Sequence, residues 1–76
     1  MASPTYTADA VRAELARKRR TQADLAAALD MTAHTLGRRL NGEVPFTIPE
    51  IVAVATYLEV SLDIFMPPVD RSALAS

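Results

Sequence analysis

The feature that most limits the fold of this chain is the short distance between two helix starts, at Thr21 and Thr32. A threonine before an amphipathic run is a typical N-cap, because its side-chain oxygen accepts a hydrogen bond from the first turn. The run QADLAAAL after Thr21 has apolar residues at helical spacing, and only Asp30 and Met31 separate it from Thr32. Aspartate tolerates the left-handed backbone that such a corner needs. The sequence therefore predicts two short helices joined by a tight turn.

The helix after this turn is expected over residues 33–40. Leu36 and Leu40 lie four residues apart and share one face, and the Asn-Gly pair at 41–42 is typical of a helix end. Gly37 is unusual inside the helix, since glycine costs about 1 kcal/mol there relative to alanine. Two arginines follow this glycine directly, so the residue with the lowest helix propensity in this helix stands beside its two positive charges.

A first helix is expected before this pair. Thr7 is the predicted N-cap, and the basic run RKRR at 17–20 closes the helix, where cations favour the negative end of the helix dipole. Val11 and Leu15 are four residues apart and form its predicted buried stripe, with Ala8 beside them.

Two more helices are expected after residue 42. The sequence TIPE at 47–50 is a capping box with proline in the first turn, and the helix runs from it to residue 58. Ser61 is the predicted cap of a last short helix, LDIFM, which the prolines at 67–68 end. No alternation of the β type occurs, so the predicted class is all-α with about five short helices. The buried stripe of the fourth helix is predicted from Ile48, Ile51, Ala55 and Leu58, with Val52 and Val54 beside it.

The length of 76 residues favours a single small domain, which buries only about 60% of its unfolded surface. We expect residues 1–76 to form this one domain, with an ordered core at about 7–67 and a flexible tail at 68–76. The longest apolar stretch, at 51–58, is much shorter than the ~20 residues of a membrane span, and no signal-peptide pattern opens the chain. With no cysteine, these features indicate a cytoplasmic protein without a membrane partner.

The charge of the chain is divided between its two halves. The formal net charge is -1, but residues 12–39 hold seven basic and three acidic side chains, whereas residues 40–76 hold five acidic side chains and one arginine. One half of the molecule is therefore predicted to be basic, which suits a nucleic-acid ligand.

The residue types that catalysis and metal binding need are scarce. The chain has one histidine, no cysteine, no glycine-rich phosphate loop and no paired carboxylates at helical spacing. We therefore expect no enzyme activity, no cofactor, no metal site and no small-molecule ligand.

Residues 21–42, TQADLAAALDMTAHTLGRRLNG, resemble the helix-turn-helix of the Cro and phage-repressor type, the lambda-repressor-like (XRE) family of bacterial and phage transcription regulators. The resemblance continues through PFTIPEIVAVATYLEVSLDIFM and covers about residues 8–66. It implies a lambda-repressor-like fold with the helix-turn-helix at 22–40, whose second helix lies in the DNA major groove. This chain departs from the family pattern at Asp30 and Glu59, where glycine is usual, at Arg39, where an apolar residue is more common, and at Arg19-Arg20, in place of Gly-Leu.

The resemblance also implies which residues contact DNA. Glycine at 37 gives the helix a close approach to the groove floor, and Arg38 beside it suits a bidentate contact to guanine; the alternative is a tolerated surface glycine and a solvated arginine. Arg39 is open to three interpretations, as a phosphate contact, an ion-pair partner or a base reader. The implied base contacts are Ala33, His34, Gly37 and Arg38. The expected DNA-backbone contacts are Gln22, Thr21, Thr32, Thr35, Arg39, Asn41, Arg19 and Arg20.

A homodimer is expected on DNA, because the family dimerises near its last helices and so holds two recognition helices about 34 Å apart. The alternative for Val60 and Met66, and for their neighbour Phe65, is that they fill the core. The predicted interface residues are Val60, Ile64, Met66, Pro67, Pro68 and Val69, with Leu74 as a further candidate.

The sequence thus predicts a double-stranded-DNA-binding transcription regulator of a bacterial or phage-infected cell, associated with the nucleoid. The favoured role is a small Cro-like or immunity-type repressor that occupies an operator. The alternative is a helical protein-interaction module, such as an antitoxin or excision-control factor, with weak or no specific DNA binding. The net negative charge and Asp30 favour this alternative.

Overall fold

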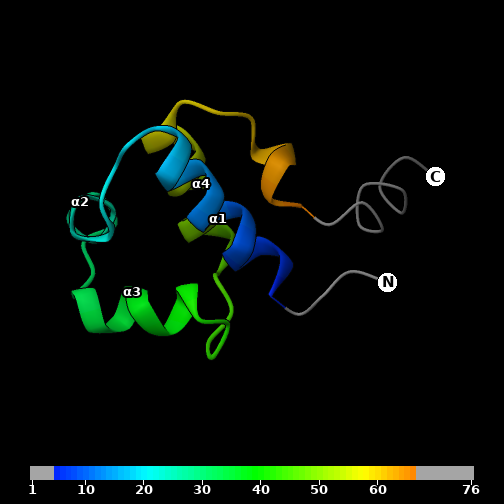
Figure 1. Cartoon of the computed structure of the whole chain (residues 1–76). Helices are drawn as coiled ribbons and strands as arrows, with labels where there is room; N and C mark the ends of the chain where they lie inside the picture. Colours follow the sequence, from blue (N-terminus) through cyan, green and yellow to red (C-terminus); the bar gives the residue numbers. More distant parts are fainter. Residues whose placement is uncertain (1–4, 67–76) are drawn as a thin grey trace.

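A computed structural model describes residues 5–66, which form four α-helices and one short 3-10 helix with no strand among them (Figure 1). The all-α class predicted from the sequence is confirmed for these residues. The last predicted helix is the 3-10 helix and is four residues long. The elements are α1 Tyr6–Arg17, α2 Gln22–Ala28, α3 Ala33–Leu40, α4 Ile48–Leu58 and η1 Leu62–Phe65.

Threonine caps start three of the helices, as the sequence predicts. The side-chain oxygens of Thr21, Thr32 and Thr47 each accept a hydrogen bond from a backbone N–H in the first turn of α2, α3 and α4. The caps of α2 and α4 are complete capping boxes, because the acidic residue three positions on also accepts from the cap's own N–H. Local sequence therefore sets where these helices begin.

The prediction that Thr7 caps the first helix is wrong. The helix begins after Thr5, and Thr7 lies inside its first turn. The Thr7 hydroxyl instead donates a hydrogen bond of 2.9 Å to the backbone carbonyl of Phe65 in η1. Its polar group therefore serves a contact between the two ends of the described chain, which helix-start patterns do not reveal.

Each of the four α-helices is followed, within two residues of its last residue, by a residue with left-handed backbone, and three of these four residues are not glycine. The corner between α2 and α3 has the form expected from the sequence, since Asp30 has φ 57° and the Met31 N–H returns to the Ala26 carbonyl at 2.9 Å. Glycine is required only after α3, because a Cβ at position 42 would lie 2.5 Å from Cγ2 of Thr5. The left-handed residues are Arg19, Asp30, Gly42 and Glu59.

The core is a single cluster of aliphatic side chains from all five elements, closed by Phe65. The prediction that Ile48 is buried is wrong: it is 65% exposed and lies in the first turn of α4, where it lines an open apolar groove with Phe46 and Met66. Val54 is fully buried instead, because the core side of α4 is centred between Ile51 and Leu58. The fully buried large side chains are Phe65, Leu25, Leu36, Val11 and Val54.

Candidate nucleic-acid interface

Helix α3 lies along one edge of the molecule, with α2 at its N-terminal end (Figure 1). It packs mainly on α1 and α2 through Leu36 and Leu40, which are buried. Because an α-helix turns by about 100° per residue, His34 and Arg38 project from the opposite side, and both are exposed. One side of α3 thus holds the helix in the domain, and the other side is open to a ligand.

The open side of α3 carries a shallow polar hollow of about 350 Å³. The hollow brings together three of the four residues predicted to contact bases, while Ala33, the fourth, is exposed in the first turn of the helix. Its lining residues are His34, Gly37, Arg38, Asn41 and Glu43.

Gly37 has no structural need to be glycine. A Cβ at this position would meet no atom within 4 Å, and positive φ among the glycines occurs only at Gly42. The fold thus carries the lower helix propensity of glycine without using its conformational freedom or its small volume. The gap in the side-chain surface of α3 lies beside Arg38, where the resemblance implies a base contact.

The two adjacent arginines have different surroundings. Arg38 is half-exposed, and its Nε lies 3.9 Å from Oε1 of Glu43, which is also half-exposed. An exposed ion pair of this kind contributes about 0–1 kcal/mol, so the guanidinium group can exchange Glu43 for another anion at little cost.

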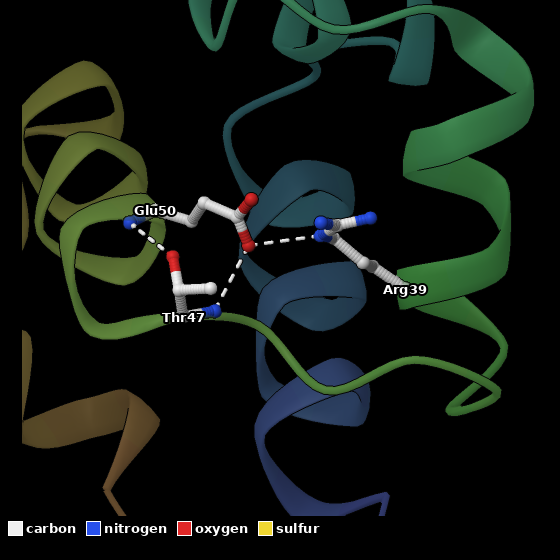
Figure 2. Close-up of polar contacts among 3 residues, drawn as sticks. All are labelled: Arg39, Thr47 and Glu50. Carbon is white, nitrogen blue, oxygen red and sulfur yellow. Dashed lines mark hydrogen bonds and ion pairs between the residues drawn. The ribbon is translucent and has the colours of Figure 1, made fainter.

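Arg39 is held in an ion pair with α4. Its Nε donates to Oε1 of Glu50 at 2.8 Å, and the two side chains are only 17% and 20% exposed. The ion-pair interpretation of Arg39 is therefore the one that the structure shows, while contact with the DNA backbone stays a prediction. Figure 2 shows the arginine reaching from α3 to the carboxylate at the start of α4.

Glu50 also belongs to the capping box of its own helix. Its Oε1 accepts a second hydrogen bond, from the backbone N–H of Thr47 at 2.9 Å (Figure 2). Burial raises the pKa of Glu50, but the hydrogen bonds from Arg39 and Thr47 outweigh burial and hold the pKa below its ordinary value. The carboxylate is thus charged at neutral pH and fixed from two sides.

The predicted backbone contacts fall at two helix N-termini and one helix end. Thr21 and Gln22 start α2, Thr32 caps α3 and Asn41 follows it, and all four are exposed. The Thr32 hydroxyl donates to Oγ1 of Thr35 at 2.9 Å. Exposed helix N-termini suit phosphate groups, because their N–H groups and dipoles favour anions.

Arg19 and Arg20 are consecutive in the sequence, but their side chains have different surroundings. Arg19 is exposed at the left-handed end of α1. The guanidinium carbon of Arg20 lies 5.7 Å from the ring centre of Tyr57, a cation–π contact with α4. DNA contact by either residue stays a prediction, and the Tyr57 partner had no signal in the sequence.

The residues predicted to form a dimer interface are only partly described. Val60, Ile64 and Met66 are half-buried around η1, whereas Phe65 is fully buried and fills the core. The remaining predicted residues, Pro67, Pro68 and Val69, lie outside the described residues, as does Leu74.

Among residues 5–66, no group of three or more histidine, cysteine, aspartate or glutamate side chains could hold a metal ion. None of the described helices is long and apolar enough to cross a membrane.

Two helices joined by a tight left-handed corner, with the second exposing a basic side, define a helix-turn-helix DNA-binding domain. A family model described as Helix-turn-helix matches residues 11–65, and the chain belongs to this family, which is of the XRE, Cro and C1-repressor type. The resemblance and the lambda-repressor-like fold predicted from the sequence are confirmed. The chain is accordingly a DNA-binding regulator of this type, whose ligand is double-stranded DNA. Searches of curated proteins and of solved structures found no match.

Proposed function

We propose that this protein is a sequence-specific repressor of the Cro or immunity type, which binds an operator through the exposed side of α3. The observation that carries the proposal is the contrast within α3: Arg39 is bound to Glu50, whereas Arg38 is exposed beside a glycine that the fold does not need. A bidentate arginine contact to guanine is worth about 1–3 kcal/mol of base discrimination. Ala33 and His34 complete the proposed base-reading surface.

The proposed phosphate contacts surround this surface. They come from the start of α2 and both ends of α3, and they fix the register of the helix on the duplex. These residues are Thr21, Gln22, Thr32, Thr35 and Asn41, with Arg19 and Arg20 as further candidates. Arg39 is left out of this set, because its guanidinium group is bound to Glu50.

A homodimer is part of the proposal, because one short helix makes few base contacts. Val60, Ile64 and Met66 supply half-buried apolar side chains near η1, at the end of the described chain that leads to Pro67, Pro68 and Val69. An inverted repeat among selected DNA sequences, together with a dimer mass on the duplex in sedimentation, is the expected result.

The test is selection of bound sequences from a random duplex pool, followed by titration at several salt concentrations. Binding by phosphate neutralisation requires the logarithm of the affinity to fall steeply with the logarithm of the salt concentration. Arg38→Ala should weaken binding to the selected duplex by about 5- to 150-fold, which corresponds to ~1–3 kcal/mol. Arg12→Ala, at an exposed arginine of α1, is the matched control and should leave the affinity near the wild-type value.

The interaction-module alternative makes the opposite forecast for the same titration. The net charge of -1 and the aspartate at the corner between α2 and α3 favour this alternative. If it holds, the titration shows no duplex binding even at low salt. That result would refute the proposed repressor.

A further inference from the structure

Helix α3 is joined to α4 by a polar junction that consists of Arg39, Thr47 and Glu50. The close backbone contacts of α3 are with α1 and α2, and α4 is not among its main packing partners. The Arg39 side chain spans the distance between α3 and the first turn of α4 (Figure 2). The C-terminal part of α3 therefore has a polar connection to α4 in addition to its apolar packing.

The junction is rigid on the α4 side. Oε1 of Glu50 accepts from the Thr47 N–H at 2.9 Å, and the Glu50 N–H donates to Oγ1 of Thr47 at 3.3 Å. The carboxylate is thus oriented by the capping box of its own helix, and it meets Arg39 Nε at 2.8 Å in that fixed position. Since both side chains are largely buried, the bond restrains the direction in which Arg39 leaves α3.

We propose that Glu50 is a positioning residue for DNA recognition: through Arg39 it sets the rotation of α3 about its axis, and with it the direction of Arg38 and the gap at Gly37. This inference rests on the proposed function, since it concerns the same reading surface. Arg39 and Arg38 are consecutive, so a turn of the helix that moves one moves the other. A bidentate contact to a base tolerates little rotation, whereas contacts to phosphates tolerate more.

The competing interpretation, Arg39 as a phosphate contact, has different consequences. A phosphate contact adds equally to every DNA sequence, and its loss lowers the salt dependence of binding by about one unit of slope. Removing Glu50 would then free the arginine and strengthen binding to all duplexes. A positioning role instead makes the loss of either partner weaken discrimination between duplexes.

The experiment is a double-mutant cycle with Arg39→Met, Glu50→Gln and the double variant. The readout is the ratio of the affinity for the selected duplex to the affinity for an unrelated duplex. A change in protein charge that alters both affinities by the same factor leaves this ratio unchanged. Each single variant should lower this ratio by about 3- to 30-fold, the range for residues that act without touching the ligand. The double variant should lower it no further than the single ones, because the two residues act as one unit. The salt slope of Arg39→Met should equal that of the wild type.

Glu59→Gln is the matched control, because it makes the same chemical change at the exposed end of α4. It should leave the ratio unchanged. All variants are compared at a temperature where circular dichroism shows full helicity, so loss of folding does not enter the ratio. Unchanged discrimination in Glu50→Gln, or a salt slope lower by about one in Arg39→Met, would overturn the positioning role.

A measurement without DNA separates this inference from the proposed function. Arg39→Met and Glu50→Gln should both displace the amide resonances of His34, Gly37 and Arg38, which Glu59→Gln should not. If the wild type bound no duplex, the proposed function would fall. These resonances alone would then decide whether Glu50 orients α3, and unchanged resonances would refute it.

Discussion

Replacement of Gly37 by alanine should make the protein more stable and its DNA binding weaker. In the free protein, the added methyl group meets no atom within 4 Å and requires no change of backbone conformation. The substitution therefore acts on folding through helix propensity alone. The same methyl group would stand on the side of α3 that is proposed to read bases, in the hollow that also holds Arg38 and His34.

The two effects have magnitudes that ordinary assays resolve. Alanine is favoured over glycine inside a helix by about 0.5–1 kcal/mol. In a domain of this size, each 1 kcal/mol raises the midpoint of thermal unfolding by roughly 4–8 °C, so we expect a rise of about 2–8 °C. A methyl group that keeps α3 from its full depth in the groove should cost at least one good base contact, or about tenfold in affinity.

Thermal unfolding followed by circular dichroism measures the first effect, and fluorescence anisotropy with the selected duplex measures the second. Ala13→Gly, at an exposed position in the middle of α1, is the reciprocal control. It should lower the unfolding midpoint by a similar amount and leave DNA affinity unchanged. An alanine variant of Gly37 that bound DNA as tightly as the wild type would show that this is only a tolerated surface glycine. A less stable variant would show that the backbone argument is wrong.

Three further outcomes are expected. Glu59→Gly should raise the free energy of unfolding by about 1 kcal/mol in chemical denaturation, because a left-handed conformation is strained for glutamate and not for glycine; a loss of stability would contradict this. Glu43→Gln should strengthen binding to all duplexes in anisotropy titrations, because it removes a negative charge 3.9 Å from Arg38; weaker binding would instead make Glu43 a DNA contact. The hydrogen bond from Arg17 to Glu14, and those from Arg39 and Thr47 to Glu50, lower the pKa of each carboxylate below its ordinary value near 4.5. The unfolded state therefore binds more protons, and the free energy of unfolding should fall as the pH drops below about 4.5, less steeply in Glu50→Gln than in the wild type.

Local signals in the sequence were enough to predict most of the helix boundaries. Thr21, Thr32 and Thr47 were correctly predicted as caps, because a cap depends on residues three positions apart. Thr7 was wrongly predicted as a cap, because its hydroxyl is used by Phe65, which is remote in the sequence. Ile48 has the spacing of a core residue but is 65% exposed, because none of the elements within residues 5–66 covers it.

In the candidate site, too, features set by nearby residues were predictable and features set by remote residues were not. The exposed side of α3 was predictable, since it is the side opposite to the apolar stripe. The partner of Arg39 was not, because Glu50 is eleven residues away and already has a local use in its capping box. The signal that was available is Arg39 itself: a charged residue where the family more often has an apolar one requires a buried counter-charge.

The left-handed joints after α1 and α4 bear on how this protein can evolve. Arg19 and Glu59 hold a conformation that glycine adopts without strain, and Glu59 lies at the far end of α4 from the Arg39 junction. At Glu59, which is not among the proposed DNA contacts, a single mutation to glycine supplies a reserve of stability. Such a reserve lets the outer side of α3 accept side chains that recognise a new operator but weaken the helix. Under the proposed function, the capacity for new DNA targets thus depends in part on Glu59, a position separate from the proposed base contacts of α3.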